Sequence, residues 1–114
     1  MGSRLVRCKD MTFAPHPRLA DVRMAACVTG KDTDTVSVCV LDIAAGVVVP
    51  LHRHDPQVDS ILVLSGKGEA YLNGKWEPVE AGDYIFVPKD EEHGIRNTGR
   101  ESLTIFVHHS PPML

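Results

Sequence analysis

Short apolar runs rich in β-branched residues, each closed by a turn residue, recur along most of this chain. From Val22 onward they read VRMAACVTG, TVSVCVLDIAAG, VVVPLHRH, VDSILVLSG, GEAYLNG, YIFVP, GIRNTG and LTIFVHH. No window carries the apolar stripe of an amphipathic helix. Many short strands indicate a closed sandwich or barrel, because closure protects the sheet edges. The sequence therefore predicts an all-β fold.

Two turns can be placed within this pattern. Asn73-Gly74 lies between two runs and predicts a two-residue hairpin, because a type I′ turn requires positive φ at both central residues. A second turn is expected from Pro88 to Glu92, after which a new strand begins at His93. These turns set the register of the strands that follow them.

The chain has 114 residues, which is enough for one hydrophobic core. We expect residues 1–21 to form an extended N-terminal arm or edge strand, since Pro15 and Pro17 prevent a helix there. Residues 22–114 then form a single barrel domain.

The net charge limits the kinds of binding partner that the sequence supports, and the cysteine spacing indicates the cellular compartment. The net charge of −3 argues against a nucleic-acid partner or an acidic membrane surface. Cys8, Cys27 and Cys39 lack CxxC spacing and are interpreted as free thiols of a reducing compartment. No segment has the pattern of a secretion signal or of a membrane span. We therefore expect a cytoplasmic protein without a membrane partner.

Two histidines stand two residues apart at the end of one apolar run. On a strand, His52 and His54 share a face and can point to the same place inside a barrel. Pro56 then interrupts the strand, so that the next strand can present Asp59 on its inner face. His93 begins a further strand in the same way. Three imidazoles and a carboxylate that converge from separate strands suit Fe, Mn, Zn, Ni or Cu, whereas an HxH pair alone is also common on exposed strands.

These residues also carry a family resemblance. The spacing of Gly46, His52, His54, Asp59 and Gly66 resembles the first cupin motif. The spacing of Gly82, Pro88, Asp90, His93 and Asn97 resembles the second motif, with fifteen residues between the two. The resemblance covers residues 46–97 and extends through the strand pattern to about 36–108. It implies a small single-domain cupin of the Cupin_2 type, that is, a double-stranded β-helix or jelly roll.

The resemblance further implies one divalent metal ion, held by His52, His54, Asp59 and His93. Two residues depart from the motifs. Asp59 stands where glutamate is usual and is shorter by one methylene, so it is either a direct ligand or a general base beside the metal. Asp90 stands where glycine is usual, but aspartate tolerates the left-handed conformation that the turn needs.

The cupin family includes dioxygenases, isomerases and lyases as well as binding proteins, so the resemblance leaves the reaction open. Three neutral imidazoles and one carboxylate leave a divalent ion with net positive charge, which favours a small, oxygen-rich, anionic molecule. We therefore expect a metal-dependent enzyme of one of these three types, or alternatively a non-catalytic cupin that binds or senses a small ligand. Outward Leu62 and Leu64 predict a homodimer. We expect His16, His108 and His109 at the surface.

Overall fold

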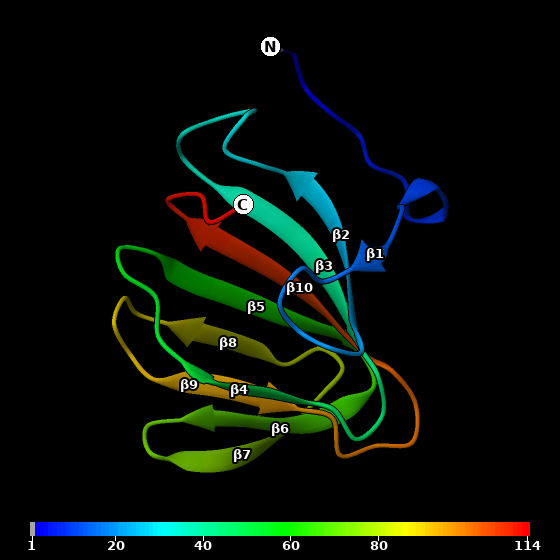
Figure 1. The fold of residues 1–114 in the computed structure, drawn as a ribbon, viewed down its shortest axis with the longest axis vertical. Helices are drawn as coiled ribbons and strands as arrows, with labels where there is room; N and C mark the ends of the chain where they lie inside the picture. Colours follow the sequence, from blue (N-terminus) through cyan, green and yellow to red (C-terminus); the bar gives the residue numbers. More distant parts are fainter. Residues whose placement is uncertain (1) are drawn as a thin grey trace.

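The computed structural model describes residues 2–114 and has an all-β architecture, as predicted (Figure 1). One short turn of 3-10 helix, η1 (Cys8–Asp10), precedes the strands of the described chain. The strands are β1 (Ala14–Pro15), β2 (Val22–Val28), β3 (Ser37–Ile43), β4 (Val48–His52), β5 (Val58–Ser65), β6 (Lys67–Leu72), β7 (Lys75–Glu80), β8 (Tyr84–Val87), β9 (His93–Arg96) and β10 (Leu103–Ser110).

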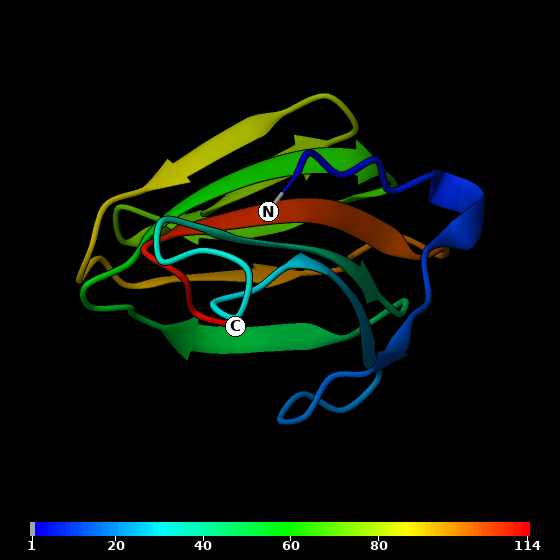
Figure 2. The same cartoon turned by 90° about the horizontal axis from the view of Figure 1, so that it is seen from above.

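The strands form two antiparallel sheets that face each other as a jelly roll (Figure 2). The larger sheet has the order β1-β2-β3-β10-β5-β8, and the smaller has the order β4-β9-β6-β7. The last strand, β10, lies between β3 and β5, and β9 lies between β4 and β6. Segments far apart in sequence are thus neighbours, which brings several strand ends together at one end of the barrel.

The core lies between the sheets because the strands bury alternate residues. Along β10 every second side chain is buried, beginning with Leu103, which is 0% exposed. On β5 the residues Asp59, Ile61 and Val63 point inward, as the sequence predicted. Both sheets contribute to the apolar cluster, which consists of Val22, Cys39, Ile43, Val49, Ile61, Val63, Ala70, Val79, Ile85, Val87, Ile95, Leu103, Ile105 and Val107.

The predicted turns are confirmed by the backbone. Asn73 and Gly74 have φ of 53° and 84° and join β6 to β7 as a two-residue hairpin. Asp90 has φ of 64°, so the aspartate does adopt the left-handed conformation. Asn97 secures the turn before β10, because its side-chain amide donates to the carbonyl of Ile43 over 2.9 Å and to that of Glu101 over 2.8 Å.

The N-terminal segment lies along the edge of the larger sheet. Ala14 pairs with Met24 of β2, so that β1 forms the edge strand. Further out, the Arg4 guanidinium donates to the carboxylate of Asp32 over 2.9 Å and holds the chain before η1 against the loop after β2. Among residues 2–114, no helix has the length and apolar character that crossing a membrane requires.

Candidate metal centre

Five polar side chains meet at one end of the barrel, and the strand pairing explains why. His52 at the end of β4 is the cross-strand partner of His93 at the start of β9. In the other sheet, Asp59 of β5 is the cross-strand partner of His109 of β10. His54 follows β4 and stands between these two pairs. The site is therefore built from one pair in each sheet plus one histidine from the loop.

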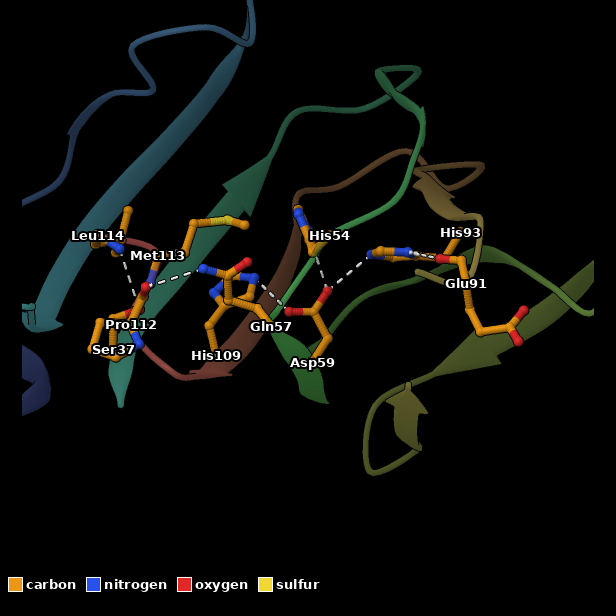
Figure 3. Close-up of polar contacts among 10 residues, drawn as sticks. All are labelled: Ser37, His54, Gln57, Asp59, Glu91, His93, His109, Pro112, Met113 and Leu114. Atoms are coloured by element: carbon orange, nitrogen blue, oxygen red, sulfur yellow. Dashed lines mark hydrogen bonds and ion pairs between the residues drawn. The ribbon is translucent and has the colours of Figure 1, made fainter. Parts of the chain in front are cut away.

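The distances show how tightly these side chains converge. The ring centres of His52 and His93 are 4.2 Å apart, and those of His52 and His54 are 4.7 Å apart. The possible ligand atoms of these three histidines all lie within 4.8 Å of one another. The carboxylate of Asp59 lies between the rings of His109 and His93, with His54 close by (Figure 3).

The two oxygens of Asp59 have different partners. Oδ2 accepts a hydrogen bond from His93 Nε2 over 2.9 Å and lies 3.5 Å from His54 Nε2. Oδ1 is in contact with His109 Nε2. His109 therefore holds one oxygen while the other faces the histidines that the sequence identified as ligands.

Backbone carbonyls orient two of the imidazoles. His52 Nδ1 donates to the carbonyl oxygen of Pro50 over 2.7 Å, and His93 Nδ1 donates to that of Glu91 over 3.0 Å. A proton on Nδ1 leaves the Nε2 lone pair of a neutral imidazole for a metal ion. In each case the carbonyl belongs to the residue two positions earlier, so the local chain itself places a proton on Nδ1.

Burial and mutual contact shift the pKa values of His52, His54 and Asp59 toward the forms that bind metals, and shift that of His93 toward its protonated form. Burial lowers the pKa of His52, and it lowers that of His54 to about 4, so both rings are neutral at neutral pH. Burial opposes ionisation of Asp59, but hydrogen bonds from His109 and His93 outweigh it and lower its pKa. Burial alone would lower the pKa of His93, but the hydrogen bonds to Asp59 and to the carbonyl of Glu91 outweigh it, so the pKa is raised.

The donor set and its spacing fit a transition-metal ion. Two ligand atoms that each lie about 2.1 Å from an ion are about 3.0 Å apart at a right angle and about 3.4 Å apart at the tetrahedral angle. The distances of 2.9 and 3.5 Å from Asp59 Oδ2 to two histidine nitrogens are close to these values. Nitrogen and carboxylate donors are those that first-row divalent ions accept. An ion would take the place of the proton that His93 and Asp59 share.

The cluster borders a cavity of about 420 Å³ between the two sheets. Its walls are mostly aliphatic, and Asp59 is the one acidic side chain among the described residues that line it. The apolar lining includes Leu41, Val49, Ile61, Leu72, Ile85, Val87, Ile95, Ile105 and Val107. A cavity of this size and character accommodates a small organic molecule beside the cluster.

The structure brings together the four side chains that the sequence singled out, His52, His54, Asp59 and His93. The expectation that His109 lies at the surface is wrong, since it is 8% exposed and contacts Asp59. A signal for it was present, because it continues the inward alternation of Leu103, Ile105 and Val107 along β10. The proline residues that follow suggested a frayed end, but the backbone N–H groups of the last two residues donate to Ser37 and hold this end in place.

The expectation that His16 is exposed is also wrong. It is half-buried and lines the same cavity, together with Arg18 and Leu19 of the loop between β1 and β2. Nothing in the local sequence indicates this position, because Pro15 and Pro17 predict only an extended chain.

The chain is similar to known proteins in sequence. A family profile described as a cupin domain matches residues 39–109. An oxalate-binding protein of Thermotoga maritima is 36% identical over 63 residues, which cover 55% of this chain and 52% of that protein. Quercetin 2,3-dioxygenase of Bacillus subtilis is 35% identical over 68 residues, which cover 59% of this chain and 20% of the enzyme. The match thus spans about half of the first relative and a smaller part of the second.

The fold is similar to that of solved structures. The crystal structure of a predicted oxalate decarboxylase from Thermotoga maritima superposes with a TM-score of 0.84 and 25% sequence identity. The superposition covers 95% of this chain and 99% of that one, so the similarity in fold extends over nearly the whole chain.

Proposed function

Because the chain belongs to the cupin family, whose profile matches residues 39–109, we propose that it binds one divalent transition-metal ion at this cluster. The proposed ligands are His52, His54, His93 and Asp59. The donor set suits Fe, Mn, Zn, Ni or Cu. The spacing of the donor atoms and the Nδ1–carbonyl hydrogen bonds support the assignment.

We further propose that the protein is a metal-dependent enzyme of dioxygenase, isomerase or lyase type, acting on a small, oxygen-rich, anionic molecule. The observation that carries this proposal is an ionised carboxylate among three imidazoles at the wall of an apolar cavity. A bound ion would act there as a Lewis acid toward an oxygen of the ligand. The aliphatic walls would exclude water, and the backbone carbonyls of Pro50 and Glu91 would hold the rings of His52 and His93 in a fixed orientation.

The alternative is a cupin that binds or senses a small ligand without turning it over. One feature of the cavity favours it, since Asp59 is the one acid among the described lining residues. If that carboxylate ligates the ion, it is not available as a general base. Of the two Thermotoga maritima proteins, the sequence relative is named for oxalate binding, whereas the solved structure is described as that of a predicted oxalate decarboxylase.

Reconstitution tests the metal site. Purified protein is stripped with a chelator, loaded with each of the five metals in turn and analysed for metal content. We expect one ion per chain for at least one metal, and loss of that ion in His93→Ala. His108→Ala is the matched control, because this neighbour of His109 lies on the opposite face of β10. No stoichiometric binding of any of the five metals would refute the proposal.

A second experiment separates catalysis from binding. Metal-loaded protein is incubated with ¹³C-labelled oxalate and, separately, with quercetin, and products are followed by carbon NMR and by absorbance. Turnover of either compound supports the enzyme. Calorimetric binding of either compound without any product supports the binding protein.

We also propose that the protein is a homodimer that pairs through the outer face of β5 and β8. Leu62, Leu64, Tyr84 and Phe86 are 38%, 46%, 61% and 55% exposed on that face. Leu62 and Tyr84 are cross-strand partners, so these side chains are contiguous, and β8 is an edge strand of the larger sheet. An apolar patch on an open sheet edge is well suited to a second copy of the same chain.

Light scattering at micromolar concentration tests the dimer against the chain mass of 12.5 kDa. We expect twice this mass for the wild type and the monomer mass for Phe86→Glu. Val48→Glu is the matched control, since Val48 is 52% exposed on the other sheet. A monomeric wild type would refute the proposed dimer.

Finally, we propose a cytoplasmic location without nucleic-acid or membrane partners. Cys8, Cys27 and Cys39 are free thiols, and the net charge is −3. Cell fractionation tests the location, and recovery in a secreted or membrane fraction would contradict it.

A further inference from the structure

The loop between β1 and β2 lies on the same side of the molecule as β4 (Figure 2). Its residues His16, Arg18 and Leu19 line the cavity that the histidine cluster also borders. The two ends of the loop are joined by the hydrogen bond from the His16 backbone N–H to the carbonyl of Val22 over 2.8 Å, and Leu19 in its middle packs against the core. It is therefore a fixed part of the cavity wall.

His16 is held in one orientation by its own turn. Its Nδ1 accepts hydrogen bonds from the backbone N–H groups of Arg18 over 3.1 Å and Leu19 over 3.2 Å. An acceptor at Nδ1 requires the proton of a neutral imidazole to be on Nε2. Burial and the charge of Arg18 lower the pKa of His16, which agrees with a neutral ring. The ring edge that carries Nε2–H is then left for a ligand.

Arg18 places a positive charge beside this ring. Two arginines line the cavity, and they differ in their partners. Arg53 donates to the backbone carbonyl of Asp90 over 3.0 Å and lies 3.9 Å from its carboxylate. The Arg18 guanidinium has neither a hydrogen bond nor an ion pair with any residue from 2 to 114. A guanidinium without an acidic partner at a cavity wall is a binding group for carboxylate or a similar anion.

The cavity that this loop and the histidine cluster both border is lined mostly by apolar side chains. The cavity volume of about 420 Å³ is within the range of sites for drug-sized ligands and far exceeds what a two-carbon dianion such as oxalate fills. Aliphatic side chains such as Leu41 and Val49 form its walls. A ligand that fills it therefore needs an apolar body between two polar ends.

We propose that Arg18 and His16 bind an anionic group of the ligand and select an organic acid with an apolar middle and an oxygen donor at its other end. This inference rests on the proposed function, because the second end is assigned to the metal ion. Arg18 supplies charge, and His16 supplies one N–H of fixed direction. Arg18 is thus a specificity residue that favours diacids longer than oxalate.

Calorimetric titration with suberate, octanoate and oxalate tests the inference. Suberate and octanoate have the same chain length, but suberate carries a second carboxylate. Each acid is titrated into Mn²⁺-loaded and metal-free protein, as wild type, Arg18→Gln and Arg18→Lys. Arg100→Gln is the matched control, since Arg100 is exposed like Arg18 but does not line the cavity.

In the Mn²⁺-loaded wild type we expect suberate to bind about fivefold more tightly than octanoate, the scale of one exposed ion pair. Arg18→Gln should bring the two affinities together, Arg18→Lys should keep part of the preference, and Arg100→Gln should leave it unchanged. Added NaCl should reduce the preference by screening the charge.

A preference for suberate that survives in Arg18→Gln would overturn the inference, as would an equal loss of oxalate and suberate binding in that variant. Failure of the metal proposal gives a different result. In that case Mn²⁺ would strengthen neither acid, while Arg18→Gln would still weaken suberate binding to the metal-free chain.

Discussion

Replacing Asp59 by alanine removes the carboxylate on which three imidazoles converge. Its Oδ2 lies 2.9 Å from His93 Nε2 and 3.5 Å from His54 Nε2, which are separations expected of ligand atoms around one ion. Loss of this group also removes one negative charge that partly neutralises the ion. We therefore expect the affinity for the bound metal to fall by about tenfold or more, or at least about 1.4 kcal/mol.

The assay is a competition titration of metal-free protein with Mn²⁺ or Zn²⁺ against a chromogenic chelator. Thermal unfolding followed by circular dichroism confirms that the variant is folded, which we expect because Asp59 borders the cavity. Glu92→Ala is the matched control, since it removes an exposed carboxylate just before His93. Unchanged metal affinity in Asp59→Ala would refute the four-ligand arrangement. The three histidines would then hold the ion alone, and Asp59 would be free to act as a general base.

Three further predictions follow from other contacts. His109→Leu removes the group that touches Asp59 Oδ1, so metal affinity should fall several-fold, while His109→Gln, which retains an N–H donor, should recover part of it in the same titration. Leu103→Ala empties a site that is 0% exposed and should lower the free energy of unfolding by about 2–5 kcal/mol in urea. The hydrogen bond from Arg4 and that from the Thr29 backbone lower the pKa of Asp32 from 3.8 to about 2, so the Arg4 contact stabilises the fold above pH 4 and this contribution is lost toward pH 2. The difference in urea midpoint between wild type and Arg4→Ala should therefore shrink over that range, and a constant difference would contradict the assignment.

The local features of the fold were predictable because each depends on a few neighbouring residues. Asn73-Gly74 forms the expected hairpin, since few other residue pairs adopt positive φ twice in succession. The inward position of Asp59 follows from the interruption at Pro56 and the alternation of the next strand. The spacing of His52, His54 and His93 was also visible, because these residues stand at the ends of recognisable strands.

Strand pairing is a property of the whole barrel, so only the tertiary structure could show which strands are neighbours. Sequence alternation turns His109 inward, but only the pairing of β10 with β5 places it opposite Asp59. Likewise, His16 and Arg18 belong to a segment with no core pattern of its own, and they line the cavity because β1 joins the edge of β2 and Leu19 packs on the core. The sequence by itself determined the β-strands, their turns and the histidine spacing, since short-range sterics and side-chain alternation control them. The tertiary structure decided the partners of Asp59 and the lining of the cavity, because those contacts join residues that are distant along the chain.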